Sequence, residues 1–239
     1  MIDHSLLHPT MTDEQLREGC EIARQYDVAS VCIKPYAVKE AAEWLQGSDV
    51  RIGAVVAFPH GNSTVEIKVA ETQRACEDGA VEIDVVVNIG KVLSQEWHYV
   101  QREIAAVLKA AHTGGAIVKV IFENDFLQDE HIIKLCDICS SLGVDFVKTS
   151  TGYGFVKGHD GQYSYRGATP HHLQLMRRHA APGVQVKAAG GVRTLDDLLA
   201  VKELGVTRVG ATATVAILEE AKMRFGGAPV SPPAADEPA

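Results

Sequence analysis

Short apolar runs alternate along the chain with longer segments in which apolar residues recur at helical spacing. The short runs are rich in Val and Ile, as expected for buried β-strands, and they occupy residues 2–5, 29–33, 51–58, 81–88, 116–122, 144–150, 184–190 and 206–210. Helical spacing is clearest over residues 64–78, 94–112 and 194–204. A strand followed by a helix, repeated at intervals of roughly thirty residues, predicts right-handed βαβ units and a parallel sheet.

Eight such units in about 230 residues fit a single closed (β/α)8 barrel, the TIM-barrel form of the α/β class. The alternative is an open, doubly wound sheet, but the glycine-rich G-x-G-x-x-G turn that marks it is missing after the first strand. We therefore expect one barrel domain over residues 1–226. The Pro/Ala-rich segment 227–239 has almost nothing to bury and is expected to be disordered.

Residues with capping chemistry stand before three helical segments. In a capping box, a Ser or Thr side chain accepts a hydrogen bond from the backbone N–H of the residue three positions later. The side chain of that later residue accepts a hydrogen bond from the backbone N–H of the Ser or Thr. The expected boxes are Thr12 with Gln15, Ser63 with Glu66, and Thr194 with Asp197.

Polar residues interrupt the strands on one face only. Both faces of a barrel strand are covered, so each polar exception needs a reason. In "VEIDVVVN" the apolar Ile83 and Val85 must meet the helices, and alternation then points Glu82 and Asp84 into the barrel. The same alternation places Lys119, Lys148 and Lys187 inside.

Asp84, Lys148 and Lys187 lie nearest the carboxyl ends of their strands, where barrels of this kind carry their chemistry. The alternative, a structural salt-bridge network that fills the lumen, is harder to justify because ion pairs inside proteins stabilise them only weakly. These residues therefore predict an active site.

The excess of lysine indicates the chemistry. A free lysine is almost wholly protonated at neutral pH, whereas burial and a second ammonium group both disfavour the charged form. Lys148 beside Lys187 is thus suited to attack a carbonyl, and Asp84 to relay protons, alone or through water. No His pair or carboxylate cluster has ligand spacing among the strand ends, so we expect Schiff-base chemistry with no metal and no cofactor.

Glycines after the last two strands suggest an anion site. Gly190 and Gly191 precede a capped helix, and "GATATV" (210–215), with Gly210 and Thr212, leads into another. Exposed N–H groups at helix starts bind anions, and phosphate often sits beside strands seven and eight of a barrel. The expected substrate is a phosphoester; tight-turn geometry is the alternative reason for these glycines.

Composition favours a small-molecule partner. The 239-residue chain carries a net charge of −8 and no Lys/Arg-rich block, which argues against nucleic acid or an anionic membrane surface. It has no long apolar stretch and no signal-peptide pattern, so we expect a soluble, cytoplasmic protein. Five cysteines are expected to be free thiols, and the Cys136/Cys139 pair is expected to be buried.

Motifs in order along almost the whole chain resemble those of the deoxyribose-phosphate aldolase family. They are "IDHSLLHP", "VCIKP", "AFPHG", "EIDVVVNIG", "VKVIFE", "FVKTSTG", "VKAAGGVR" and "RVGAT". The resemblance implies a class I aldolase on a (β/α)8 barrel that cleaves 2-deoxy-D-ribose 5-phosphate reversibly to acetaldehyde and D-glyceraldehyde 3-phosphate without a metal. It makes Lys148 the Schiff-base lysine, Lys187 the group that lowers its pKa, and Asp84 the partner in proton relay.

The expected site includes further residues around this core. Gly152 joins the phosphate-binding set. Supporting positions are expected at Lys119, Ser5, Cys32 and Thr149. A homodimer or homotetramer is possible.

Three departures from the family pattern bear on the substrate. The segment "YGFVKGHDGQYSYRGATP" inserts extra residues on the catalytic face, which suggests a lid or a binding element. Within it, Tyr163 and Tyr165 are expected either to cover the substrate or to contact another subunit. Thr212 and Ala213 stand where the family tends to have two serines, and 124–126 replaces a commoner Thr-Gly-Glu-like run.

Several alternatives remain open. One is a Schiff-base aldolase for a different or unphosphorylated aldehyde, and another is a phosphosugar isomerase. A non-catalytic sugar-binding barrel gives no reason to gather ammonium groups. For His4, His60 and His159 structural or loop roles are expected, because lysine and aspartate already supply the proton steps.

Overall fold

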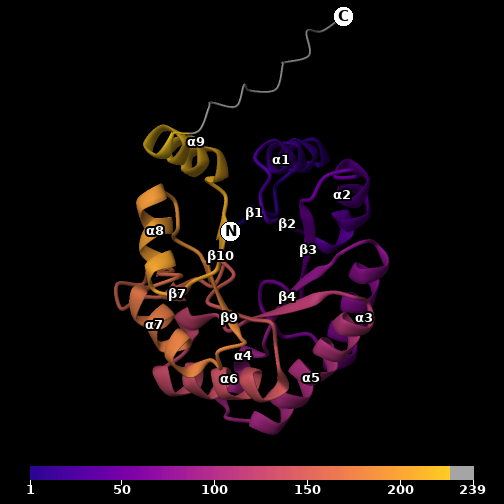
Figure 1. The fold of residues 1–239 in the computed structure, drawn as a ribbon. Helices are drawn as coiled ribbons and strands as arrows, with labels where there is room; N and C mark the ends of the chain where they lie inside the picture. The colour runs from indigo at the N-terminus through magenta and orange to yellow at the C-terminus, as the bar shows by residue number, and fades with distance from the viewer. Residues whose placement is uncertain (227–239) are drawn as a thin grey trace, which may run out of the picture.

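Eight parallel strands close into a barrel in the computed structural model, which describes residues 1–226 (Figure 1). The order around the barrel is β1-β10-β9-β6-β5-β4-β3-β2. The barrel strands are β1 (Ile2–Leu6), β2 (Ser30–Ile33), β3 (Arg51–Val56), β4 (Glu82–Val86), β5 (Ile117–Ile121), β6 (Phe146–Lys148), β9 (Gln185–Ala189) and β10 (Arg208–Ala211). The predicted (β/α)8 barrel is confirmed, and closure excludes the doubly wound sheet.

Helices form the outer layer around this barrel (Figure 1). The α-helices are α1 (Asp13–Gln25), α2 (Val38–Trp44), α3 (Val65–Glu77), α4 (Ile89–Leu93), α5 (Trp97–Thr113), α6 (Asp129–Leu142), α7 (Pro170–His179), α8 (Leu195–Glu203) and α9 (Thr214–Phe225). Two 3₁₀ turns, η1 (Pro35–Ala37) and η2 (Asn124–Phe126), follow β2 and β5. The expected disordered segment 227–239 lies outside the described residues.

The helix boundaries follow local capping chemistry. The capping boxes at Thr12 and Thr194 are confirmed. The box expected at Ser63 is wrong: Thr64, one residue later, accepts from the N–H of Ile67 and starts α3. Likewise, the helix expected over 94–112 begins at Trp97, because Gln95 takes a left-handed backbone with φ 56° that separates α4 from α5.

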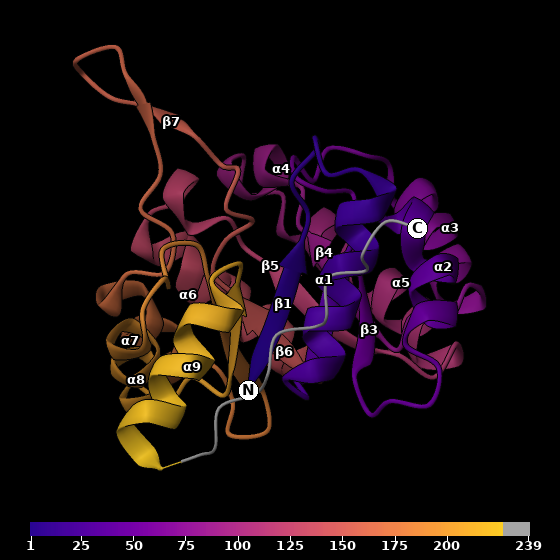
Figure 2. The same ribbon diagram turned by 90° about the horizontal axis from the view of Figure 1, so that it is seen from above.

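The inserted segment forms a small antiparallel ribbon that projects from the body of the molecule (Figure 2). Its strands are β7 (Val156–Lys157) and β8 (Tyr163–Ser164). The base is fixed to η2, where the Asp125 carboxylate accepts from the N–H groups of Arg166 at 2.9 Å and Gly167 at 2.8 Å. The unusual run after β5 thus anchors the insertion.

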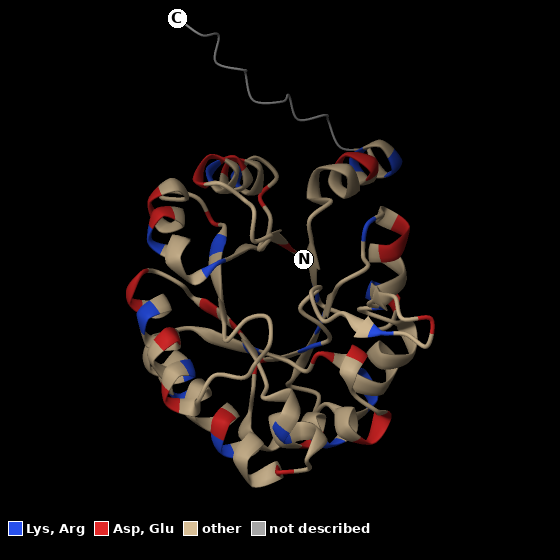
Figure 3. Cartoon of the chain, turned by 180° about the vertical axis from the view of Figure 1, so that it is seen from behind, with Lys and Arg blue, Asp and Glu red and all other residues tan. Residues whose placement is uncertain are grey.

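Charged residues divide into two groups. Many lie on the helices around the outside, and others lie on the strands within the ring (Figure 3). All five cysteines are free, and Cys136 and Cys139 are buried between α6 and the core as expected. No helix among residues 1–226 is long and apolar enough to cross a membrane.

Candidate active site

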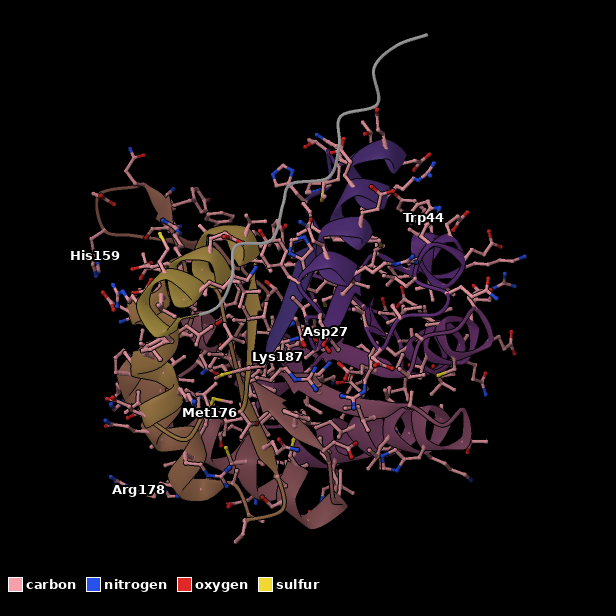
Figure 4. All side chains as sticks on the ribbon, turned by 45° about the horizontal axis from the view of Figure 1, so that its top comes forward. Asp27, Trp44, His159, Met176, Arg178 and Lys187 are labelled. Carbon is pink, nitrogen blue, oxygen red and sulfur yellow. The ribbon has the colours of Figure 1, made fainter. Side chains whose placement is uncertain are left out.

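The charged residues that strand alternation points inward do line the lumen. Glu82, Asp84, Lys119 and Lys187 are each 0% exposed, and Lys148 is 2% exposed. Lys187 lies inside the barrel, whereas His159 is at the outer end of the inserted ribbon (Figure 4). All five side chains therefore lie inside the barrel, as strand alternation predicts.

Asp84 is the centre of this cluster. Its Oδ2 accepts from Lys148 Nζ and from Lys187 Nζ, each at 2.7 Å, and its Oδ1 accepts from Lys119 Nζ at 2.7 Å. Burial alone would raise the pKa of Asp84, but the three ammonium groups outweigh it and hold the pKa well below its ordinary value. Asp84 is thus a carboxylate that binds two lysines through one oxygen.

Lys148 and Lys187 are brought together by strand register. Their Cα atoms are direct partners on the neighbouring strands β6 and β9. Lys187 Nζ also lies 2.5 Å from Asp3 Oδ2. Burial disfavours its charge, but Asp3 and Asp84 outweigh burial and raise the pKa of Lys187. Lys187 therefore remains a cation next to Lys148.

The lumen holds more positive than negative charge. Three carboxylates (Asp3, Glu82, Asp84) meet four basic side chains (Lys119, Lys148, Lys187, Arg208). Lys119 and Lys187 each contact more than one carboxylate, whereas Lys148 contacts Asp84 alone. Of the three lysines in the lumen, Lys148 therefore has the fewest compensating charges.

Two members of this network, Asp3 and Arg208, are absent from the sequence prediction. Arg208 Nη1 lies 2.5 Å from Asp3 Oδ1 and 3.0 Å from Glu82 Oε2. The same alternation applied to "IDHSL" and "RVGA" would have found both, since Asp3 shares a face with Ser5 and Arg208 with Gly210. In each of these two strands, alternation points the one Asp or Arg of the strand into the barrel.

A cavity of about 350 Å³ opens above Lys148 and Lys187 at the carboxyl ends of the strands. Seven further expected site residues line it: Ser5, Cys32, Gly152, Gly190, Gly191, Gly210 and Thr212. Lys119 lies deeper, on Glu82 and Asp84. Thr149 does not face the cavity, because its hydroxyl bonds both the N–H and the C=O of Ala189 and ties β6 to β9.

One side of the cavity carries backbone N–H groups that are not used in the described chain. The N–H groups of Gly152, Gly191 and Thr212 have no hydrogen-bond acceptor within residues 1–226. Gly152 and Gly191 have φ of 86° and 90°, a left-handed backbone that glycine adopts without strain. Arg193, which the sequence analysis does not single out, adds an exposed cation to the same wall.

The inserted segment supplies the aromatic part of the cavity wall. Tyr153, Phe155 and Tyr165 line it, with Phe155 and Tyr165 packed edge to face at 5.3 Å between ring centroids. A Cβ added at Gly190 would lie 3.3 Å from the Tyr165 ring. The insertion therefore packs directly on the part of the cavity wall formed by Gly190 and Gly191, which we call the glycine wall. Tyr163 is 65% exposed on the outer ribbon and does not line the cavity.

The expected structural histidines are placed away from the lysines. His4 is buried, its Nδ1 lies 2.7 Å from the Thr214 hydroxyl, and burial lowers its pKa to about 4. His60 lines a separate hollow beside Phe58. A group with metal-ligand chemistry (Asp129, His171, His172) lies between α6 and α7, where His171 Nε2 and Asp129 Oδ2 already lie at hydrogen-bond distance, 2.8 Å apart.

The molecule also has a larger hollow, of about 810 Å³, between α3 and α5. It belongs to the outer helical layer, and its only charged wall residues are Glu77 and Lys109. The cluster of several buried lysines and carboxylates beside a cavity lies at the barrel mouth, which we therefore take as the candidate site.

Similarity to known proteins agrees with this site. The sequence model of the DeoC/LacD family aldolases matches residues 1–217. The chain belongs to the DeoC/LacD aldolase family. A deoxyribose-phosphate aldolase of Rhodopirellula baltica is 51% identical over 226 residues, which cover 95% of this chain and 90% of that protein.

Solved aldolase structures share the fold of this family member. An aldolase named QR15 superposes with a TM-score of 0.84 at 32% identity, covering 93% of this chain and 94% of that one. The deoxyribose phosphate aldolase of Aeropyrum pernix, described as a unique tetramer, gives a TM-score of 0.82 at 31% identity, covering 94% and 90%. The chain is thus an aldolase enzyme, as the sequence motifs implied, which disfavours the isomerase and the sugar-binding barrel.

Proposed function

We propose that this aldolase reversibly cleaves 2-deoxy-D-ribose 5-phosphate to acetaldehyde and D-glyceraldehyde 3-phosphate through a Schiff base on Lys148. The observation that carries the proposal is the pair Lys148 and Lys187 on one oxygen of Asp84, directly below an open cavity. The aldolase of Rhodopirellula baltica, with 51% identity, supports the choice of substrate.

The reaction begins at the neutral amine of Lys148. Its Nζ bonds to the C1 carbonyl carbon of the open-chain sugar, and the resulting carbinolamine loses water to give a protonated imine. The C3 hydroxyl then gives up its proton while the C2–C3 bond breaks, which releases the three-carbon aldehyde and leaves a two-carbon enamine. Protonation at C2 and hydrolysis release acetaldehyde and restore the lysine.

The charged neighbours of Lys148 favour each stage of this sequence. The Lys187 cation disfavours a second ammonium group beside it, and so favours the neutral amine that attacks. The Asp84 carboxylate stabilises the positive charge that returns when the imine is protonated. Because Asp84 is held ionised, it acts as a proton acceptor in a relay with water at the cavity mouth rather than as an acid by itself.

The phosphate is proposed to bind at the glycine-lined part of the cavity. The N–H groups of Gly152, Gly191 and Thr212 and the guanidinium of Arg193 offer donors there, beside the starts of α8 and α9. Gly190 allows the backbone to approach closely, and Gly210 lies beside Lys187, where an added Cβ would be 3.5 Å from Lys187 Cε.

Borohydride trapping tests the reaction class and the nucleophile together. With acetaldehyde and borohydride, we expect a two-carbon adduct on Lys148 that peptide mapping locates. The Lys148→Met variant, which fills the same space without an amine, should give no adduct at any residue. An adduct on another lysine, or no adduct in the parent enzyme, would reject the proposal.

A second candidate is an aldolase for an unphosphorylated or different aldehyde. Two observations favour it: the inserted segment adds Tyr153, Phe155 and Tyr165 to the wall, and Ala213 lacks a hydroxyl. The ratio of kcat/KM for 2-deoxyribose 5-phosphate to that for 2-deoxyribose decides between them. A ratio near or below one would favour the second candidate.

We also infer a homo-oligomer, a dimer or tetramer. The tetrameric aldolase of Aeropyrum pernix supports this, as do exposed Met223 and Phe225 on α9, which are 79% and 70% exposed. Light scattering after size exclusion tests it, and a monomer at all protein concentrations would refute it.

A further inference from the structure

Glu123 occupies an unusual position directly after β5. Its backbone is left-handed, with φ 60° and ψ 62°, a conformation that non-glycine residues adopt with strain. The side chain is only 1% exposed, and no Lys or Arg within residues 1–226 lies at ion-pair distance from it. Burial raises the pKa of Glu123 to about 7, although hydrogen bonds from Thr151 act in the opposite direction. Stability alone does not explain a carboxyl group in this place.

The loop that follows the reactive lysine closes around this carboxyl group. The Thr151 N–H lies 3.2 Å from Glu123 Oε1 and 3.3 Å from Oε2, and the Thr151 hydroxyl donates to Oε2. The Thr151 hydroxyl oxygen also accepts from the N–H of Tyr153 at 2.9 Å. A Cβ added at Gly154 would lie 2.5 Å from Glu123 Cδ, so the absence of a side chain at Gly154 leaves room for this carboxyl group. Residues 151–154 thus pack closely around the Glu123 side chain.

The opposite side of the same loop faces the substrate cavity. Thr151, Gly152 and Tyr153 line the cavity, whereas Glu123 does not. Gly152 is packed against the glycine wall, because a Cβ added at Gly190 would lie 3.8 Å from Gly152 Cα. Displacement of Thr151 would therefore move Gly152 away from the anion side of the cavity and leave the Lys148–Asp84 contact in place.

We propose that Glu123 is a positioning residue for the phosphate end of the substrate, acting through Thr151 to hold Gly152 beside Gly190. The proposal rests on the phosphorylated substrate proposed above. Glu123 does not touch the reacting atoms, and it acts on binding of the phosphate rather than on imine formation.

The test compares Glu123→Ala with Glu123→Gln on two substrates. In Glu123→Ala we expect KM for 2-deoxyribose 5-phosphate to rise about tenfold, with KM for 2-deoxyribose and borohydride labelling of Lys148 by acetaldehyde unchanged. Glu123→Gln keeps an oxygen that accepts from Thr151, so its KM should stay within about threefold of the parent value. An equal change in both KM values, or none, in folded Glu123→Ala overturns the proposal.

Two further variants separate positioning from general stability. Glu103→Gln changes a carboxyl that is equally buried, at 1% exposure, but distant from the cavity; it should lower Tm without altering either KM. If Glu123→Ala does not fold, Thr151→Val removes the hydroxyl donor instead, and it should raise KM for the phosphorylated sugar selectively. Failure of Lys148 labelling in the parent enzyme would reject the aldolase mechanism, whereas normal labelling with an unaltered KM ratio would reject only the role of Glu123.

Discussion

Two groups of buried lysines in this protein have different consequences. Outside the barrel, Lys68 on α3 pairs with Glu103 on α5 at 2.7 Å, and Lys68 Nζ also donates to the Val86 carbonyl at 2.7 Å. Inside, Lys148 shares one carboxylate with two other lysines. The outer pair is balanced one to one, whereas the lumen carries an excess of positive charge beside an open cavity.

The balance of charge has different effects on the Lys68–Glu103 pair and on the charged groups of the lumen. Burial lowers the pKa of Lys68 even with Glu103 beside it, and burial raises the pKa of Glu103, so both partners are drawn toward their neutral forms. In the lumen, paired charges keep Asp84 ionised and Lys187 protonated. Within residues 1–226, Lys148 contacts one carboxylate only, Asp84, and lines the cavity.

The largest expected effect comes from Lys148→Met. Without the nucleophile, kcat should fall on the order of 10⁴-fold or more. Since the variant removes one cation from a lumen that has an excess of them, the free energy of unfolding should change by less than about 1 kcal/mol. Steady-state rates and urea unfolding measure the two quantities. A large loss of stability would mean that Lys148 is mainly structural.

The opposite outcome is expected for Lys68→Met. This change leaves Glu103 buried without its cation and should destabilise the fold by about 3–5 kcal/mol, while kcat and KM of the folded enzyme stay at parent values. The double variant Lys68→Met/Glu103→Gln keeps an acceptor for the Asn88 N–H and should regain most of the loss. If kcat of folded Lys68→Met falls, the contrast between the Lys68–Glu103 pair and the lysines of the lumen is wrong.

Glu123 extends the comparison to a buried carboxyl group with no ion-pair partner in the described chain. Its pKa rises from 4.5 unfolded to about 7 folded, so between these values the folded state binds the extra proton and stability falls as pH rises. Relative to Glu123→Gln, the parent should lose up to about 3 kcal/mol of unfolding free energy between pH 5 and pH 8. Urea unfolding of both proteins across this range gives the difference, and a flat difference would contradict it.

The smallest expected effect is at the rim of the site. Arg193→Gln removes an exposed cation from the anion side of the cavity, so KM for 2-deoxyribose 5-phosphate should rise about tenfold, equivalent to about 1.4 kcal/mol. KM for unphosphorylated 2-deoxyribose should not change, and added salt should weaken the parent's binding of the phosphorylated substrate more than the variant's. An equal effect on both sugars would place Arg193 outside the phosphate site.

Strand alternation accounts for most of the site that sequence could predict. Side chains with a period of two on a strand covered on both faces leave few choices for Glu82, Asp84 and Lys119. The same rule points Asp3 and Arg208 into the barrel as well. Helix starts were harder to predict, because the side chains of both Ser63 and Thr64 can cap a helix. Only the folded backbone places Thr64 at the start of α3.

The linear sequence determined the barrel, its repeating units and the inward direction of Lys119, Lys148 and Lys187, because these depend on local periodicity. The tertiary structure alone decided that Lys148 and Lys187 share one oxygen of Asp84, that Tyr165 covers the glycine wall, and that Glu123 holds Thr151. Such contacts join strands and loops distant in sequence, and their distances follow from barrel register and closure, which no local pattern specifies.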